Sequence, residues 1–431
     1  MHELTLLIKN DMVPALGVTE PGAIAFCVAK ARSYLGGELR HLNVAMNSGM
    51  YKNAFTCGIP NSSEVGNVFA AALGYVAGDA SRGLESLAAV KPEDNELAAK
   101  YIEEGKVTVE LSGITSRIFI QAQLETSEGS AEVTIRDSHT NVTKVVVNSQ
   151  TLLETEGEKA SDTSEEDAKA EIHTIHKYTL AQILDYVETV PADEISFVRE
   201  AYRVNLELFE EGLNNPRTTF ARLMLAMNGG KVISDDEKRT ASLLCNAAIE
   251  ARVIGLDKPA MSITGSGAHG IIATMPLYAV YKINKLSEET LWRATMLSYL
   301  VCMYIKEYSG RLSAFCGCGI AAGSGMAMAV CWMKGGSLQQ LEYVLNNMTA
   351  SLTGMVCDGG NQGCVMKGIA ACATAFECVE FALNGVHVDN VHGIIGRTPE
   401  ETMRNIGLIA SPGMVQTEKV IVEIQESKLK V

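Results

Sequence analysis

Four short runs of strand-like sequence follow one another between residues 106 and 149, and the sequence around them is mostly helical in pattern. The runs are KVTVELS, RIFIQAQLET, SAEVTIRDS and TKVVVNSQ. Each alternates apolar with polar residues or is rich in β-branched ones, and Gly, Ser or Asn separates it from the next. This is the pattern of short strands joined by turns. We therefore predict an antiparallel meander of four strands here.

Helical spacing of apolar residues dominates the rest of the chain. It is found at 3–13, 21–35 and 64–78, and it continues from 179 to about 385. Two more strands are expected, one at 38–48 running into a loop and one at 418–425, EKVIVEIQ, closing the chain.

These patterns predict an α+β protein. Its mainly helical body would comprise residues 1–100 and 200–431. A small α/β insertion, residues 101–199, would contain the antiparallel sheet.

The charge balance argues against a nucleic-acid partner. The formal net charge is −15, and no cluster of Lys and Arg offers a footprint for phosphates. Part of the acidity is local, in ETEGEKASDTSEEDAKAE (154–171), which is poor in apolar residues. Such a composition predicts a solvated linker or an exposed loop.

No export or membrane segment is expected. The N-terminal sequence MHELTLLIKNDMVPALG lacks a long apolar core and a cleavage site. The most apolar stretch, LVCMYIKEY (300–308), contains Lys306 and Glu307 and is too short to span a bilayer. We expect a cytoplasmic protein with no membrane partner, whose eleven cysteines are reduced thiols or metal ligands rather than a disulfide framework.

Two glycine-rich stretches contain paired cysteines. FCGCGIAAGSG (315–325) contains Cys316 and Cys318, and CDGGNQGC contains Cys357 and Cys364. Glycine lets backbone N–H groups approach sulfur, so four thiols in such loops suit a metal or a cluster. Their spacing matches neither the common zinc knuckles nor the ferredoxin runs. Thiols that merely fill crowded helix contacts, as expected for Cys245, Cys331, Cys372 and Cys378, are the alternative.

Three other loops could bind a small anion or move a proton. TGSGAHG (264–270) could cradle a carboxylate or phosphate with backbone N–H groups, Ser266 and His269, or it could be a plain turn between helices. In the loop at 46–67, Lys52 could hold a carboxylate or act as a base, although a solvated turn fits equally. GVTEPGAIAF (17–26) has the same two interpretations, since Thr19 and Pro21 also suit a simple helix start in which Glu20 only complements the helix dipole.

Six stretches occur together in an order that resembles one family, the iron–sulfur L-cysteine desulfidases. These enzymes are related to the α-chain domain of the iron–sulfur L-serine dehydratases. The resemblance runs from about residue 14 to residue 425. The stretches are GVTEPGAIAF, YKNAFTCGIP…FAAALGYVAGD, TGSGAHGIIATMP, EYSGRLSAFCGCGIAAGSG, CDGGNQGCVMK and NIGLIASPGMVQTEKVIVEI.

The resemblance implies an oxygen-sensitive 4Fe–4S cluster, no pyridoxal phosphate, and β-elimination that converts L-cysteine to pyruvate, ammonia and sulfide. Three cysteines would hold the cluster and leave the fourth iron open for a small amino-acid substrate. Matched to the family motifs, the ligands are Cys318, Cys357 and Cys364, with Cys316 as the runner-up to Cys318. The remaining candidates should line the same cavity: Lys52 and His269 for catalysis, and Ser48, Asn53 and Ser266 for binding the substrate.

Three positions depart from the motifs of the family. Val18 stands where the family usually has a cysteine, Asn61-Ser62-Ser63 stands where it has Gly-Thr-Gly, and Ala268 stands in place of an asparagine. All lie in loops of the expected site, so they bear on the choice of substrate. The same chemistry on L-serine or another β-substituted amino acid is one alternative, and an amino-acid- or cluster-binding relative without turnover is another. The sequence is also compatible with a homodimer.

Overall fold

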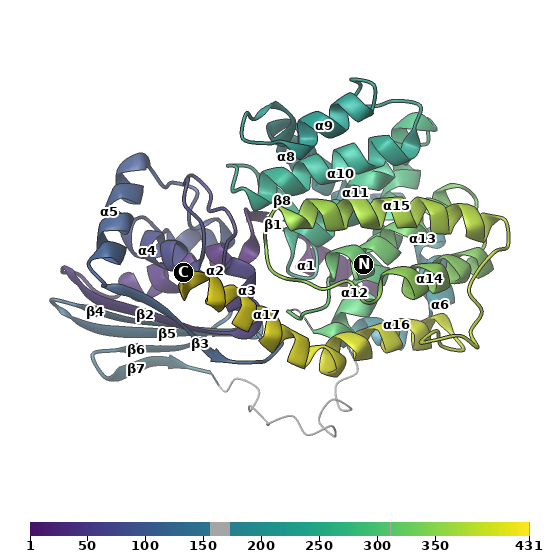
Figure 1. The fold of residues 1–431 in the computed structure, drawn as a ribbon. Coiled ribbons are helices and arrows are strands. Elements are labelled where there is room, and N and C mark those ends of the chain that lie inside the picture. Colours follow the sequence, from purple (N-terminus) through teal and green to yellow (C-terminus); the bar gives the residue numbers. More distant parts are fainter. Residues whose placement is uncertain (156–172, 311, 431) are drawn as a thin grey trace.

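The computed structural model describes residues 1–155, 173–310 and 312–430 and has an α+β fold, as the sequence predicted. A six-stranded sheet with its covering helices forms one lobe, and a helical body forms the other (Figure 1). Most of the acidic stretch expected as a linker lies outside the described residues. None of the helices within the described ranges is long and apolar enough to cross a bilayer.

The strand order in the large sheet is β3-β2-β4-β5-β6-β7. Strands β4 (Phe119–Thr126), β5 (Gly129–Arg136), β6 (Val142–Val147) and β7 (Gln150–Glu154) form an antiparallel meander. The predicted meander was wrong in one respect, because its first run, β3 (Val107–Gly113), pairs in parallel with β2 (Leu39–Asn47).

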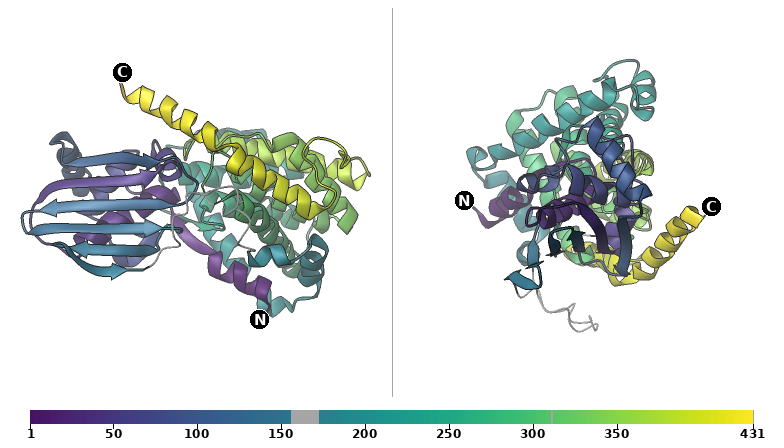
Figure 2. Two further views of the ribbon diagram at one scale, coloured as in Figure 1. Left: turned by 90° about the horizontal axis from the view of Figure 1, so that it is seen from below. Right: turned by 90° about the vertical axis from the view of Figure 1, so that its left-hand side faces the viewer.

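Strand β2 separates β3 from β4 because it is hydrogen-bonded on both edges. A parallel pair needs a long crossover connection. The segment between β2 and β3 supplies it with α3 (Ser48–Ala54), α4 (Asn67–Val76) and α5 (Pro92–Glu103). Helices α2 (Thr19–Arg32) and α4 pack on one face of the sheet, and Figure 2 shows the other face without helices. The expected helices at 21–35 and 64–78 and the strand at 38–48 are thereby confirmed.

The helical body is built around four buried helices, which pack in sequence order. These are α10 (Glu237–Val253), α11 (Gly267–Ile283), α12 (Glu288–Ser309) and α13 (Gly323–Met333). A short antiparallel pair of β1 (Val13–Leu16) and β8 (Pro259–Ser262) lies beside them. The surrounding helices are α1 (Glu3–Asp11), α6 (Leu180–Thr189), α7 (Ala192–Ile195), α8 (Arg199–Asn214), α9 (Phe220–Met227), α14 (Leu338–Leu352), α15 (Gly363–Leu383) and α16 (Pro399–Leu408).

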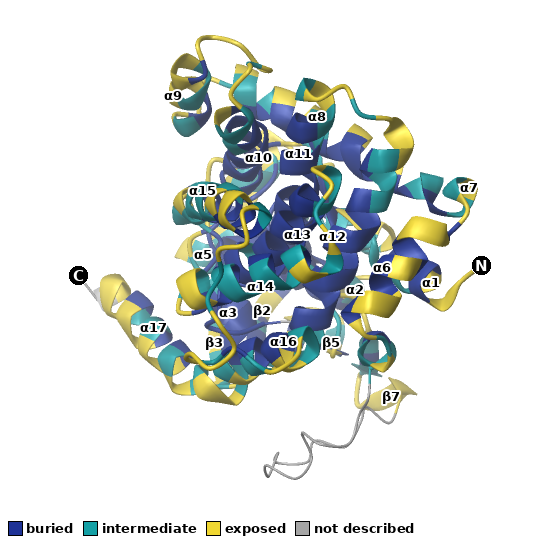
Figure 3. Cartoon of the chain, turned by 90° about the vertical axis from the view of Figure 1, so that its right-hand side faces the viewer, coloured by how far each residue is buried: buried dark blue, intermediate teal, exposed yellow. Residues whose placement is uncertain are grey.

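The strand expected at 418–425 was wrong, because this segment lies within helix α17 (Val415–Ser427). Its β-branched residues suggest a strand, but burial follows a helical period: Glu418, Val422 and Gln425 are buried. Val420 and Ile424, which a strand would place on the same face as Val422, are 52% and 53% exposed. The helix crosses from the body to the sheet lobe and packs on α3, while its outer face remains open to solvent (Figures 1 and 3).

Candidate active site

The two cysteine-containing stretches lie side by side. We call residues 313–319 the first thiol loop and residues 355–364 the second thiol loop. Phe315 and Val356 form an antiparallel bridge between them. Two backbone hydrogen bonds flank it, from Cys316 N to Met355 O at 3.0 Å and from Cys357 N to Ala314 O at 2.6 Å. Segments far apart in the sequence therefore place their thiols in one neighbourhood.

The thiols of the two loops interact with one another. The Cys318 thiol donates a hydrogen bond to Cys316, which lowers the pKa of Cys316 to about 6 and raises that of Cys318. The charges of Cys364 and Cys357 also raise the pKa of Cys318, so all four sulfurs are electrostatically coupled neighbours. Burial, followed by the charge of Cys357, raises the pKa of Cys364 to about 11. All eleven cysteines are free, so the chain has no internal disulfide.

Lys52, on α3, ties the two thiol loops together. Its Nζ donates to Ser313 O at 3.0 Å and to Cys357 O at 2.9 Å, and it forms a salt bridge with Glu418 at 3.4 Å. The lysine side chain is fully buried. Burial lowers the pKa of Lys52, but the charges of Cys357 and Glu418 outweigh it and raise the pKa above its ordinary value. Lys52 is therefore a buried ammonium whose N–H groups are directed to Ser313 O, Cys357 O and Glu418.

Glu418 was missed at the sequence level because the segment that contains it was expected to be a strand. It comes from α17 and accepts a hydrogen bond from Ser48 Oγ at 2.8 Å. Ser48 thus contacts this carboxylate and Thr115 rather than the thiols. A helical reading of 418, 422 and 425 would have placed Glu418 on the inner face of α17.

Asn53 contacts the second thiol loop directly. Its backbone O accepts a hydrogen bond from Gly360 N at 3.0 Å, and its Oδ1 lies 3.9 Å from Cys357 Sγ, which donates to it. Its Nδ2 donates to Oε1 of the buried Glu20 at 2.8 Å. Val18 approaches the same loop: a Cβ on Gly360 would lie 2.7 Å from Val18 Cγ1. The position that departs from the family motif therefore faces the thiol-bearing loop.

His269 faces the first thiol loop from α11. Its Nε2 would lie 2.7 Å from a Cβ on Gly317, so only glycine leaves room for the ring. On the other side of the ring, Nδ1 lies 2.6 Å from Thr264 Oγ1, and that hydroxyl donates to Ile263 O at 2.7 Å. With the hydroxyl proton assigned to Ile263 O, the hydroxyl accepts from Nδ1–H and a lone pair is left on Nε2. Burial, and then the charges of Lys306 and Arg252, hold the pKa of His269 well below its ordinary value.

Two helices that begin at this site have no side-chain cap. Val18 precedes α2 and Ser266 precedes α11, and neither caps its helix. Helix α15 differs, because Gly363 N donates to Asn361 Oδ1 at 2.7 Å and the next two N–H groups are bonded to backbone carbonyls. Starts without a cap from the preceding residue also occur away from the site, at α4, α8, α9 and α17. Unpaired N–H groups at a helix start favour negative charge, so the starts of α2 and α11 are suited to an anion.

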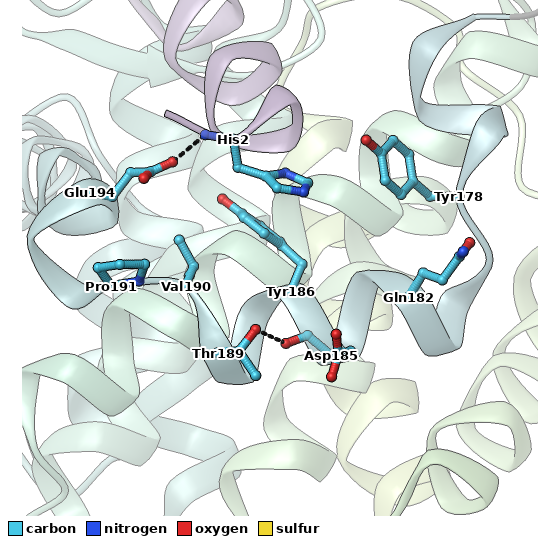
Figure 4. Close-up of a pocket in the computed structure, with 9 residues that line it drawn as sticks. All are labelled: His2, Tyr178, Gln182, Asp185, Tyr186, Thr189, Val190, Pro191 and Glu194. Atoms are coloured by element: carbon cyan, nitrogen blue, oxygen red, sulfur yellow. Dashed lines mark hydrogen bonds between the residues drawn. The ribbon is translucent and has the colours of Figure 1, made fainter.

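A separate cleft of about 490 Å³ lies beside the N-terminus, between α6 and α7 (Figure 4). His2 stacks on Tyr186 there, with ring centroids 4.5 Å apart. Its polar groups are largely paired with the protein, since Glu194 accepts from His2 N and from Thr5 Oγ1. None of the residues predicted as functional lines this cleft.

Fold and site together define an α+β protein with a partly buried, thiol-lined centre beside the starts of α2 and α11. The chain belongs to the serine dehydratase alpha chain family, whose model matches residues 81–423. The matched range includes both thiol loops and His269 but begins after Lys52.

Several relatives match nearly the whole chain. A UPF0597 protein of Clostridium botulinum (strain Hall) is 38% identical over 418 residues, 97% of each chain. One of Caldanaerobacter subterraneus is 35% identical over 428 residues, 99% of this chain and 98% of the relative. One of Clostridioides difficile (strain 630) is 32% identical over 428 residues, 99% of each.

Proposed function

We propose that this protein is a 4Fe–4S lyase that catalyses β-elimination of L-cysteine to pyruvate, ammonia and sulfide. The observation that carries the proposal is the meeting of the two thiol loops with His269 beside the uncapped start of α11. Membership in the serine dehydratase alpha chain family supports the reaction class, because dehydration of serine is also a β-elimination. In this proposal the enzyme is cytoplasmic, needs no pyridoxal phosphate, and takes a small amino acid as its partner.

The donor set fits a cluster better than a single ion. Across residues 1–155, 173–310 and 312–430, no three His, Cys, Asp or Glu side chains lie close enough to share one metal ion. A cluster spans several ångströms and holds its thiolates further apart, and thiolates are its usual ligands. We assign Cys318, Cys357 and Cys364 as the ligands, with Cys316 as the runner-up. The bound cluster would supply a Lewis acid for the departing sulfur or oxygen.

His269 is the base in this proposal. The lone pair on Nε2 faces the first thiol loop, and the depressed pKa keeps the ring neutral near pH 7. A neutral imidazole held in one tautomer by Thr264 can accept the Cα proton of a substrate beside it. The uncapped first turn of α11 would receive the negative charge of the substrate, near Ser266.

Lys52 holds the site in place rather than accepting a proton. Its charge is stabilised by Glu418, and its bonds to Ser313 O and Cys357 O fix the two thiol loops relative to each other. Asn53 and Glu20 are our candidates for receiving the substrate amino group, since they supply an amide oxygen and a buried carboxylate beside Cys357.

A relative that binds without turnover is the second candidate, favoured by one observation. Val18 packs on Gly360 of the second thiol loop, and valine has neither a lone pair nor an ionisable group. If the family cysteine at this position is the base, this chain would bind a cluster or an amino acid without eliminating.

The proposal is tested by pyruvate release from a panel of L-amino acids, with protein purified and assayed without oxygen. We expect pyruvate from L-cysteine, and we expect His269→Asn to lower turnover by about 100-fold or more with unchanged iron content. The matched control His392→Asn alters an exposed histidine and should retain full turnover. Release of pyruvate from L-serine alone would identify L-serine as the substrate. Iron-loaded protein that releases no pyruvate from any amino acid would favour a relative that binds without turnover.

A further inference from the structure

Arg252, near the end of α10, is a buried cation with little to pair with. It is only 4% exposed, and its Nη2 donates one long hydrogen bond, of 3.5 Å, to Thr19 Oγ1. Its Nε has no hydrogen-bond partner within the described residues. No salt bridge to a carboxylate is found for it in the described ranges either. Burying a charge without a partner is costly, so such a residue usually has a function that needs it.

The guanidinium lies where two uncapped helices begin. Thr19 is the first residue of α2, and Gly267 is the first residue of α11. A Cβ on Gly267 would come within 2.8 Å of Arg252 Nε, so the absence of a side chain there lets the guanidinium lie against the helix start. The free N–H groups of the first turn of α11 therefore lie beside the guanidinium of Arg252.

The surroundings favour an anion rather than a cation. Arg252 and Lys306 both act on His269, two residues beyond Gly267, as positive charges. Glu20 is the acidic neighbour on α2, and it already accepts a hydrogen bond from Asn53. A small anion would relieve the unpaired guanidinium and the free N–H groups together.

We propose that Arg252, the first turn of α11 and the Thr19 hydroxyl form the binding site for the α-carboxylate of the amino-acid substrate. The guanidinium fork matches a carboxylate with two parallel N–H···O bonds, which a lysine cannot provide. A carboxylate held at Gly267 presents its Cα toward His269, because both residues belong to the first turn of α11. The inference rests on the proposed function, since it assigns the substrate's carboxylate to that same site.

The experiment measures binding of a ligand that cannot react. L-Alanine has the carboxylate, amino group and Cα of the substrate but no leaving group, and L-alaninamide lacks the carboxylate charge. Calorimetry on oxygen-free wild-type protein should show L-alanine binding about 100-fold more tightly than L-alaninamide. Arg252→Met should weaken the binding of L-alanine by about 100-fold and leave the binding of L-alaninamide nearly unchanged. The affinity of Arg252→Lys for L-alanine should lie between those of wild type and Arg252→Met.

The thermal unfolding midpoint separates a binding role from a structural one. Arg252→Met removes an unpaired buried charge, so its midpoint should stay level or rise, whereas loss of a structural contact would lower it. Arg239→Met is the matched control, because Arg239 is on the same helix but exposed, and it should bind L-alanine as wild type does.

The inference is overturned if Arg252→Met and wild type bind L-alanine equally, or if wild-type protein does not bind L-alanine. Failure of the proposed function gives a different result: no amino acid is converted to pyruvate, yet L-alanine still binds in an Arg252-dependent way. The two failures are therefore distinguishable.

Discussion

The buried pair of Lys52 and Glu418 should stabilise the fold far more than an ion pair on the surface of the same helix. Lys52→Met leaves Glu418 buried without a counter-charge and leaves Ser313 O and Cys357 O without their donor. Breaking such a pair by removing one partner costs about 3–5 kcal/mol. The control is Lys419→Met, which breaks the Lys419–Glu423 pair of α17, whose side chains are 56% and 60% exposed. Loss of an exposed pair costs about 0–1 kcal/mol.

The assay is denaturant unfolding of the three proteins, followed by the double variant Lys52→Met/Glu418→Gln. The glutamine removes the stranded charge and keeps an acceptor for Ser48 Oγ, so it should recover about 1–3 kcal/mol of the loss. Because Lys52 also fixes both thiol loops, turnover of Lys52→Met should fall by about 100-fold. Equal losses for Lys52→Met and Lys419→Met, or no recovery in the double variant, would refute this reasoning.

Three further predictions concern single positions. Val18→Cys places a thiol against Gly360. The visible absorbance of the cluster should then fade more slowly in air, and turnover should be similar to that of wild type. A large gain in turnover without added air stability would instead place the base at position 18. Gly317→Ala should displace the imidazole of His269 and cut turnover by about 100-fold, while Gly354→Ala, where a Cβ meets nothing within 4 Å, should not. Burial lowers the pKa of His176, which stacks on Tyr308, so protonation disfavours the folded state. As the pH falls below about 6.5, wild type should lose unfolding free energy relative to His176→Phe, and parallel pH profiles would contradict this.

Local sequence patterns predicted most elements of the fold but not how they pair. Alternation identified the run at 107–113 as a strand, yet its parallel partner, β2, lies on the far side of three helices in the sequence. No local signal decides which edge of β2 a strand joins. At 418–425 the β-branched residues fit both a strand and a helix, and packing on α3 selected the helix.

The parts of the site that belong to a sequence motif could be predicted. The parts made by contacts between distant segments could not. Glycines around Cys316 and Cys357 marked the thiol loops, and the resemblance to a family joined them to His269. The local sequence around Arg252, EARVIGL, is that of an ordinary helix end. Its significance comes from lying between Thr19 and Gly267, which are distant in sequence. Glu418 was missed for another reason, because the segment that contains it was expected to be a strand rather than helix α17.

The convergence of Cys318, Cys357 and Cys364 on one cluster is the central claim, and iron and acid-labile sulfide content test it most directly. Protein purified without oxygen should contain about four iron and four sulfide per chain. Replacing any of the three cysteines by serine should remove most of both, whereas Cys331→Ser, in a helix core away from the loops, should remove neither. Wild-type protein without iron, or three serine variants that each keep the full complement, would contradict the account.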